Sequence, residues 1–272
     1  MTFSIVARSG TAFGVAVASR FLAAGAVVPA ADAAAGALAT QAWANLAYRP
    51  QGLTMLRTGV APADVVAALT TADGLRAERQ LGVVGPAGDG ASYTGEECVP
   101  WAGGVVGDGY AIQGNILTGP EVVAAMEGAW LAGAEQPLTA RLLAVLAAGD
   151  AAGGDRRGRQ SAALYVVDPG KGFAGSGDVA YDLRVDDHPD PVAELRRLLG
   201  VHELLFGAGD PASLLELTAE LSAEVESRLA RLGHTSLEHW AGLENIEGRL
   251  VRDAVDPVLL DHLRAVSERV GG

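Results

Sequence analysis

A regular alternation of residue types at the start of the chain constrains the fold more than any other feature of the sequence. Two sets of side chains alternate over residues 2–7, namely Phe3, Ile5 and Ala7 against Thr2, Ser4 and Val6. A Ser9-Gly10 turn follows, and the alternation resumes with Phe13, Val15 and Val17. Because successive side chains of a β-strand point to opposite faces, this period of two predicts a β-hairpin over residues 2–18.

The rest of the N-terminal part predicts further strands and helices in pairs. Strands are expected at residues 37–42, 81–84, 91–94, 110–117, 161–167 and 181–185. Helices are expected at residues 52–58, 62–70, 118–134 and 137–148, and from Asp190-Pro191 onward. The string Thr118-Gly119-Pro120-Glu121 has the form of a capping box at the start of one of them. Paired strands, paired helices and strands again predict the α+β class, with sheets and helices in layers.

The pattern changes after about Phe206. Residues 207–211 have the composition of a linker, and apolar residues then recur at intervals of three or four, namely Leu214, Leu217, Leu221, Val225, Leu229 and Leu232. This spacing predicts an amphipathic helix over residues 214–232 that ends at Gly233. Shorter helices are expected near residues 237–250 and 257–270. We therefore expect a layered domain over residues 1–207 and a small helical appendage over residues 208–272.

Charge and cysteine content narrow the class of protein. The chain of 272 residues has 33 acidic and 20 basic residues, a formal charge of -13, which argues against nucleic acid or an anionic membrane as a partner. Its single cysteine, Cys98, excludes a disulfide framework within the chain. The N-terminus shows no basic leader before an apolar stretch, and no segment approaches the ~20 apolar residues of a membrane span. We expect a cytoplasmic protein.

No motif in the sequence predicts a cofactor or a metal ion. The glycines form neither a P-loop nor a GxGxxG string after a strand, so a nucleotide fold is not supported. The run Asp186-Asp187-His188-Pro189-Asp190 contains metal-ligand residue types, but no second histidine completes the spacing of a metal site, and Asp190 is expected to cap a helix. We therefore expect no cofactor and no metal.

Thr2 is the first candidate for chemistry. It directly follows Met1, and removal of Met1 would expose a threonine with a free α-amine. Such a residue is a complete catalytic unit, because its hydroxyl can attack a carbonyl carbon while its amine accepts the proton. Many proteins begin with Met-Thr without this role, so the pair alone favours an ordinary N-terminus.

The loop at residues 153–161 is the strongest local anomaly. Its sequence is Gly153-Gly154-Asp155-Arg156-Arg157-Gly158-Arg159-Gln160-Ser161, with three arginines close together in an acidic chain. The planar guanidinium fork suits a carboxylate or a phosphate. The alternative is a solvated loop whose arginines pair with neighbouring acidic residues.

Two groups of amide and hydroxyl side chains stand at the ends of predicted strands. Gln113-Gly114-Asn115 ends one strand just before a helix, where amide and helix N–H groups can stabilise a developing oxyanion. An ordinary strand-to-helix turn is the alternative. Thr40, Gln41 and Asn45 form a similar polar cluster, in a stretch that also offers Trp43 and Tyr48 as pocket walls.

Taken together, these segments resemble a bacterial family catalogued as domain of unknown function 1028. The resemblance spans about residues 1–205, and its most specific string is the one at residues 153–161; the others are residues 2–7, 14–19, 40–42, 113–115 and 186–189. It implies membership of the N-terminal nucleophile (Ntn) hydrolase superfamily and the four-layer αββα sandwich of the proteasome. The tail, at residues 240–247 and 256–260, is similar to a short domain described as peptidoglycan-binding; an oligomer contact by the helix at 214–232 is the simpler alternative.

The resemblance also implies roles for single residues. Thr2 matches the nucleophile of proteasome-type Ntn hydrolases. Ser19-Arg20 matches an Asp-Ser/Thr-Arg stretch in which Ala18 replaces the acid, and Asp155 matches the acid of an Asp-x-x-Ser motif with Gly158 in place of the serine. The supporting lysine of that superfamily is missing near residues 33–34, and the one lysine of the chain is Lys171.

Three hypotheses follow for the function. The first is an Ntn-type amidohydrolase acting on a small anionic amide or related C–N bond, with Thr2 as nucleophile, Gln113 and Asn115 at the oxyanion, and Asp155 orienting the amine. Its substrate-binding residues would be Ser19, Arg20, Thr40, Gln41, Asn45, Arg157, Arg159, Gln160 and Ser161, with the last two arginines holding a carboxylate. The second is a non-catalytic protein of the same fold that binds a small anionic metabolite. The third is a scaffold whose tail drives homo-oligomer assembly or contacts peptidoglycan.

Overall fold

The structure, a computed structural model, describes residues 2–207, 209 and 211–270. The chain divides into two compact units, one ending at Arg197 and the other beginning at Leu198. This division falls inside helix α6 (Pro191–Phe206), earlier than the boundary expected between residues 207 and 208. Residue 208, where the appendage was expected to begin, lies outside the described residues, as does Met1.

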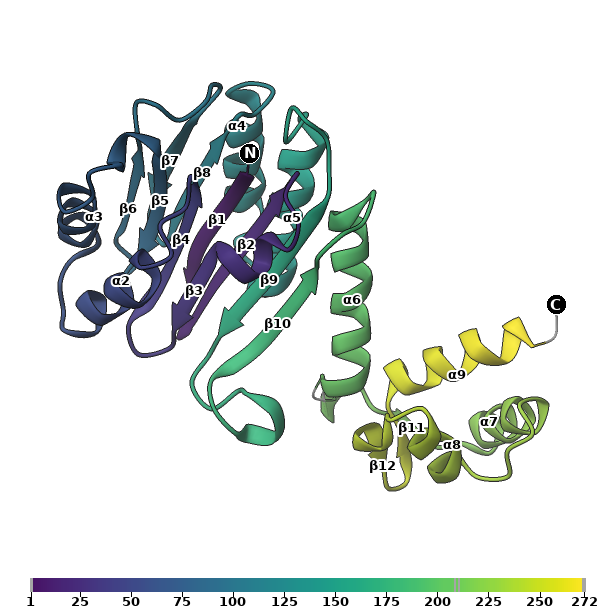
Figure 1. The fold of residues 1–272 in the computed structure, drawn as a ribbon. Coiled ribbons are helices and arrows are strands. Elements are labelled where there is room, and N and C mark those ends of the chain that lie inside the picture. Colours follow the sequence, from purple (N-terminus) through teal and green to yellow (C-terminus); the bar gives the residue numbers. More distant parts are fainter. Residues whose placement is uncertain (1, 208, 210, 271–272) are drawn as a thin grey trace. The chain divides into compact units, whose positions relative to one another are not determined.

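The first unit is built around a six-stranded antiparallel sheet with the predicted hairpin at its centre (Figure 1). The strand order is β10-β9-β2-β1-β8-β7. The bounds are β1 (Thr2–Ser9), β2 (Ala12–Ser19), β7 (Gly103–Gly107), β8 (Tyr110–Asn115), β9 (Ser161–Val167) and β10 (Val179–Val185). In the hairpin, Phe3 pairs with Ala18 and Ser9 pairs with Ala12, which confirms the expected pair of strands.

A second, four-stranded antiparallel sheet faces the first. Its order follows the sequence: β3 (Pro29–Asp32), β4 (Gly36–Ala42), β5 (Arg79–Val84) and β6 (Gly90–Thr94). Strands β4 and β5 lie against β1 and β8 of the larger sheet. The four-residue helix α1 (Ala24–Val27) joins the two sheets.

Helices cover the outer face of each sheet. Helices α2 (Tyr48–Arg57) and α3 (Pro62–Thr71) pack on the four-stranded sheet, and α4 (Glu121–Ala132) and α5 (Leu138–Ala151) pack on the six-stranded sheet (Figure 1). The mixed α+β class expected from the sequence is confirmed. The expected capping box is wrong in one respect, since α4 has Pro120 at its N-cap and no side chain caps it.

Both faces of the central hairpin are buried, which explains its low polarity. Val6, Val15 and Val17 belong to the apolar core between the two sheets. On the opposite face Phe3 lies against Gly149 of α5. A separate apolar cluster beneath α2 and α3 includes Leu38 on the outer face of β4. Apolar side chains therefore contribute to the packing between the two sheets and between each sheet and its helices.

The second unit is a small bundle of helices with a three-stranded sheet that the sequence did not predict. Its helices are α7 (Ala219–Arg231), α8 (Leu237–Leu243) and α9 (Pro257–Arg269), and its strands are β11 (Leu215–Glu216), β12 (Leu250–Val251) and β13 (Ala254–Val255). The helix expected over residues 214–232 begins only at Ala219, because the Thr218 side chain caps it by accepting the Leu221 N–H at 3.2 Å. Trp240 and Leu263 are at the core of this unit.

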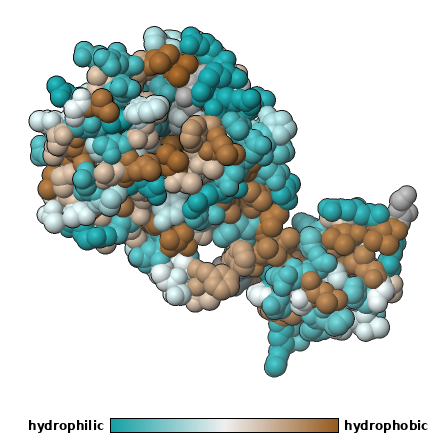
Figure 2. Space-filling model, viewed as in Figure 1, coloured by the Kyte–Doolittle hydropathy of each residue, from teal (hydrophilic) through white to brown (hydrophobic). Residues whose placement is uncertain are grey.

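Within the described residues, none of the helices combines the length and the apolar character needed to cross a membrane. Hydrophobic residues nevertheless reach the surface in several places on the face shown in Figure 2. Over the whole described surface of the first unit, the most exposed large hydrophobic side chains are Phe173, Trp43, Leu131 and Leu22.

Candidate functional site

A row of polar side chains crosses one end of the six-stranded sheet. Ser161 of β9 pairs with Ser19 of β2, and Thr2 of β1 pairs with Asn115 of β8. The Thr2 and Ser19 hydroxyl oxygens are 3.1 Å apart and hydrogen bonded. Because directly opposed residues of antiparallel strands project to the same face, all four side chains point toward the second sheet. Four residues predicted as site residues are thereby brought together.

Behind this row lies a network of buried amides. The Gln41 amide donates to the Gln80 side-chain oxygen at 2.8 Å and to the Thr2 carbonyl oxygen at 3.2 Å. Asn115 donates to the same Gln80 oxygen at 2.9 Å and to the Thr2 carbonyl at 3.5 Å. Gln80 in turn donates to the Gly114 carbonyl at 2.7 Å. All three amide side chains are almost fully buried, so their mutual bonds fix the backbone at Thr2.

Gln113 belongs to the same network but turns away from Thr2. Its amide nitrogen donates to the Ser4 hydroxyl at 2.6 Å, and Ser4 donates to the Gln41 side-chain oxygen at 2.6 Å. The Gln113 side-chain oxygen is buried without a hydrogen-bond partner in the described structure. This side chain fits only because residue 82 is glycine: a Cβ there would lie 2.1 Å from the Gln113 oxygen.

The polar and apolar residues of the sheet interface are segregated. One end contains Thr2, Ser4, Ser19, Gln41, Gln80, Gln113, Asn115 and Ser161, all buried. The other end contains Val6, Phe13, Val15, Val17, Ala37, Ala39, Val84, Ala111 and Val167. Buried polar groups cost stability unless they are paired, so a concentration of them at one end marks that end as functional.

A cavity of about 340 Å³ opens beside Thr2. Thr2 and Gln41 are its polar lining residues, and the rest of the wall is apolar: Phe21, Ala24, Val27, Val28, Ala42, Trp43, Ala44 and Leu46. Trp43, predicted as a pocket wall, is 67% exposed and lines the mouth. Tyr48, predicted for the same role, is the first residue of α2 and is buried in the apolar cluster beneath α2 and α3 instead.

Strained backbone surrounds the same end of the sheets. Ala23, Ala42 and Ile116 have φ values of 53°, 64° and 52°. Residues with a Cβ avoid this left-handed region, and a β-branched residue does so most strongly. Each of the three immediately adjoins a residue of the cavity or of the buried row, namely Ala24, Gln41 and Asn115. Such strain persists where the surrounding structure enforces it, which is typical of functional sites.

Asp155 lies at the end of β2, next to this row. Its carboxylate accepts the backbone N–H of Arg20 at 2.7 Å and the backbone N–H of Arg157 at 2.9 Å. The Arg157 guanidinium is 3.4 Å from the same carboxylate. The described contacts of Asp155 therefore hold the 153–161 loop against the end of β2, and none of them reaches Thr2.

Arg159 and Gln160 of the arginine loop form contacts within the protein. Arg159 forms an ion pair with Asp150 at 2.8 Å, and its carbonyl accepts a hydrogen bond from the Arg20 side chain at 2.8 Å. The void lined by Arg159 and Asp155 measures about 10 Å³, room for about one water molecule. The Gln160 carbonyl accepts the His188 N–H at 2.8 Å.

Ser161 fixes the segment that leads into α1. Its hydroxyl donates to the Phe21 carbonyl at 2.6 Å and accepts the Ala24 N–H at 3.1 Å. Phe21 and Ala24 both line the Thr2 cavity. Ser161 therefore shapes the cavity wall through the backbone and does not line it.

Thr40 and Asn45 belong to a third cluster, on the outer side of β4. The Asp73 carboxylate accepts hydrogen bonds from Asn45, Tyr48 and Arg79, each at 2.9 Å. The Arg79 hydrogen bond, followed by that of Asn45, holds the pKa of Asp73 far below its usual range. Burial, followed by the Asp73 hydrogen bond, raises the pKa of Tyr48.

This cluster supports the loop at the mouth of the cavity. Arg79 also donates to the Trp43 carbonyl. The Thr40 hydroxyl donates to the Asn45 carbonyl at 3.4 Å. Trp43 lines the cavity, so Asp73 and Arg79 hold the position of its rim from outside.

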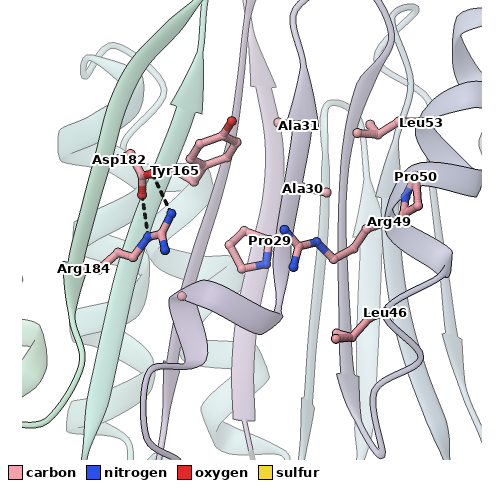
Figure 3. A pocket seen from close by; sticks show the side chains of 11 residues that line it. Pro29, Ala30, Ala31, Leu46, Arg49, Pro50, Leu53, Tyr165, Asp182 and Arg184 are labelled. Atoms are coloured by element: carbon pink, nitrogen blue, oxygen red, sulfur yellow. Dashed lines mark hydrogen bonds and ion pairs between the residues drawn. The ribbon is translucent and has the colours of Figure 1, made fainter.

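A second cavity of about 430 Å³ lies on the other side of α1 (Figure 3). Arg49 and Arg184 extend into it from opposite sides, and Arg184 pairs with Asp182 through two bonds of 2.7 and 2.6 Å. Arg49 donates to the carbonyls of Ala26 and Val27 in α1. Leu46 lines both cavities.

Sequence reasoning missed three residues of the site. Ser4 and Gln80 are central to the buried network, and Asp73 anchors the cavity rim. Ser4 did carry a signal, since it shares a strand face with Thr2 and Val6. Gln80 carried none, because its amide partners Gln41 and Asn115 are 39 and 35 residues away in the sequence. Asp73 is six residues from Arg79, but its other two partners, Asn45 and Tyr48, are 28 and 25 residues away.

The comparisons with known proteins agree on one family. The model of a family described as "Family of unknown function (DUF1028)" matches residues 2–195. The chain belongs to this family. Protein SPO2555 from Silicibacter pomeroyi, a DUF1028 protein by its description, is 33% identical in sequence. Its crystal structure superposes with a TM-score of 0.68 over 74% of this chain and 89% of that chain. None of the curated proteins matches.

The DUF1028 match includes the whole candidate site. It begins at Thr2 and ends two residues before the structural division at Arg197. The buried network, both cavities, the arginine loop and the Asp73 cluster lie within the matched residues. The second unit lies outside them, so the family's shared part corresponds to the first unit.

Proposed function

We propose that this DUF1028 protein is an Ntn-type amidohydrolase that cleaves a small amide or related C–N bond, with Thr2 as nucleophile after removal of Met1. The paired sheets with helices on both outer faces support the αββα sandwich of that superfamily. The observation that carries the proposal is the position of Thr2: at the start of a central strand, with its hydroxyl hydrogen bonded to Ser19 and its side chain in the wall of a cavity.

The proposed reaction has two halves. The Thr2 hydroxyl oxygen attacks the amide carbon while the α-amine of Thr2 accepts the hydroxyl proton. The tetrahedral intermediate then expels the amine product, which takes that proton and leaves an ester between the acyl group and Thr2. Water hydrolyses the ester, releasing the acid and restoring the threonine. No cofactor takes part.

The amides of the network act as positioning residues in this scheme. Gln41 and Asn115 donate to the Thr2 carbonyl oxygen, so they fix the backbone from which the nucleophile projects. The side-chain amides of Gln113 and Asn115 were expected to face an oxyanion. The Gln113 amide donates instead to Ser4. The Asn115 amide donates to Gln80 and to the Thr2 carbonyl. Preorganisation of the nucleophile is therefore the contribution we assign to them.

Asp155 and the arginines have a supporting role in the same scheme. Asp155 holds Arg20 and Arg157 at the end of β2, adjacent to Ser19. Among the described residues that line the Thr2 cavity there is no arginine. Arg157 and Arg159 are ion-paired with Asp155 and Asp150, and their side chains are 45% and 47% exposed, so an anion that they bound would lie outside the described lining of the Thr2 cavity.

A non-catalytic binding protein of the same fold is the second candidate. One observation favours it: the described hydrogen bond of the Thr2 hydroxyl is to Ser19, and no titratable side chain contacts it in the described structure. The α-amine would have to be the only base. Binding without turnover would use the same cavity.

The test begins with the N-terminus of the purified protein. Intact-mass analysis should show that Met1, which lies outside the described residues, has been removed. Ammonia release from a panel of primary amides should then be detectable for the unaltered protein, lost in Thr2→Ala and retained in part in Thr2→Ser. Complete retention of Met1, or full turnover by Thr2→Ala, would refute the nucleophile.

A further inference from the structure

We infer that the Thr2 cavity receives an uncharged apolar group of the substrate, the acyl chain attached to the scissile carbonyl. This inference rests on the proposed function: if Thr2 is the nucleophile, the scissile carbonyl of the substrate lies beside Thr2, at one end of the cavity. It assigns a substrate class that differs from the anionic amide expected from the sequence.

The composition of the wall is the first argument. Apart from Thr2 and Gln41, the lining residues are Phe21, Ala24, Val27, Val28, Ala42, Trp43, Ala44 and Leu46. The Gln41 amide is already bonded to Gln80 and to the Thr2 carbonyl. None of the described lining side chains is charged, so a carboxylate in the apolar part of this cavity, away from the Thr2 α-amine, would lose its hydration without a charged side chain to replace it. An alkyl or aryl group there would gain from burial.

The rim supplies the second argument. Phe21, Trp43 and Leu46 are 53%, 67% and 51% exposed, so three large apolar side chains stand at the mouth in contact with solvent. Exposed apolar side chains gathered around a cavity are the signature of a binding site. An apolar chain entering the cavity would cover them and remove them from water.

The third argument is that the rim is fixed rather than loose. Arg79 holds the Trp43 carbonyl and is itself paired with Asp73 at 2.9 Å. On the opposite side Ser161 holds the Phe21 carbonyl at 2.6 Å. A ligand that enters a preformed apolar cavity does not have to pay the entropy cost of ordering the cavity's side chains and loops. Its volume of about 340 Å³ exceeds the ~150 Å³ of a dry cavity that accepts benzene, so a medium-length acyl or phenylalkanoyl group has room.

Two matched amides test the inference. Hexanamide and glutaramate share the primary amide and the following three methylene groups, and then differ in a terminal ethyl group against a carboxylate. Their binding to Thr2→Ala protein, measured by isothermal titration calorimetry, is independent of turnover. We expect hexanamide to bind about tenfold more tightly or better, as two buried carbon groups imply.

A rim variant supplies the control. Leu46→Arg places a cation at the mouth, at a position that is 51% exposed, and Leu131→Arg, at a 60% exposed position of α4 that does not line the cavity, is the matched control. Leu46→Arg should shift the ratio of the two affinities toward glutaramate, while Leu131→Arg leaves it unchanged. Equal or tighter binding of glutaramate to the Thr2→Ala protein, or no binding of either amide at millimolar concentration, would overturn the inference.

The outcomes separate this inference from the proposed function. Preferential hexanamide binding without ammonia release from the unaltered protein would retain the apolar site and reject the nucleophile. Ammonia release that favours glutaramate over hexanamide in kcat/KM would retain the nucleophile and reject the apolar site.

Discussion

At the residue scale, the organisation of the site depends on single amides that serve several partners. Gln80 accepts from Gln41 and Asn115 with one oxygen and donates to the Gly114 carbonyl with its nitrogen. Removing one such side chain leaves several buried groups unpaired at once. Removal of the Gln80 side chain should therefore lower the free energy of unfolding more than substitution of a polar residue with a single hydrogen bond.

Gln80→Leu should lower the free energy of unfolding by about 3 kcal/mol or more, since each unpaired buried group costs ~1–3 kcal/mol. Gln51→Leu, at an exposed position of α2, is the control and should change stability by less than about 0.5 kcal/mol. Urea denaturation followed by circular dichroism measures both. A Gln80 variant as stable as the control would show that the network does not hold the two sheets.

Asp73 predicts a pH dependence with a definite sign. Its pKa is lowered in the folded protein, mainly by the Arg79 hydrogen bond, while in the unfolded chain it has its ordinary value of about 3.9. The stability it contributes is present above about pH 4 and is lost as the pH falls further. The urea midpoint of Asp73→Asn should accordingly fall less between pH 5 and pH 3 than that of the unaltered protein; parallel curves would contradict this assignment.

At the element scale, the two sheets approach closely at a position where the residue of the smaller sheet is a glycine. Gly82 of β5 faces Gln113 of β8, and a Cβ at that position would lie 2.1 Å from the Gln113 oxygen. Neither residue can move independently, because each belongs to a paired strand on its own sheet. The spacing between the sheets at the functional end is therefore set by this pair.

Gly82→Ala should destabilise the protein by about 1–3 kcal/mol, the usual cost of overpacking a core. Gly74→Ala is the matched control, because a Cβ there has no neighbour within 4 Å. Thermal unfolding by calorimetry gives both values. A Gly82 variant that unfolds at the unaltered temperature would mean that Gln113 can turn aside without loss.

Two helices of the second unit begin at capping residues that differ in the number of interactions they make. Thr218 caps α7 with one hydrogen bond, whereas Asp256 caps α9 and also pairs with buried Arg249 at 2.8 Å. Thr218→Ala should cost about 1 kcal/mol and Asp256→Ala about 3 kcal/mol or more, because the second change leaves a buried cation without its partner. Urea denaturation followed by circular dichroism measures both losses; equal losses would contradict the role of the Arg249 pair.

At the scale of the whole molecule, the chain consists of two units with separate cores. The first unit holds the DUF1028 match and the candidate site, and the second has its own cluster around Trp240 and Leu263. Separate cores predict separate unfolding transitions. For the second unit, homo-oligomer assembly and peptidoglycan binding stay proposals. The size of the protein particle in solution, with and without this unit, tests the proposal of homo-oligomer assembly.

A chain ending at Arg197 should fold and keep the cooperative unfolding of the first unit, because the cores between and beneath its sheets lie within those residues. Circular dichroism on heating checks this. Light scattering on size-exclusion chromatography should show a smaller assembly than the full chain if the second unit drives association. A truncated chain that unfolds without cooperativity would refute the independence of the first unit.

Local patterns in the sequence were enough to predict much of the secondary structure and to identify the family. The alternation at residues 2–18 predicted the central hairpin, and the Asp190-Pro191 pair predicted the start of α6. These predictions succeed because strand period and helix capping depend on residues a few positions apart. The late start of α7 shows the limit, since Thr218 ended a leucine pattern that would otherwise extend the helix back to Leu214.

Only the tertiary structure decided what the candidate residues do. The sequence by itself identified Thr2, Gln41, Gln113, Asn115 and the arginine loop as chemically capable. It did not show that Asn115 bonds to Gln80, and Ser4 to Gln41, across the two sheets, over separations of 35 and 37 residues. Nor did it show that Arg159 and Arg157 are paired with Asp150 and Asp155 while an apolar cavity opens at Thr2. Residue type determines which bonds a side chain can make, but the packing of distant strands determines which partner it meets.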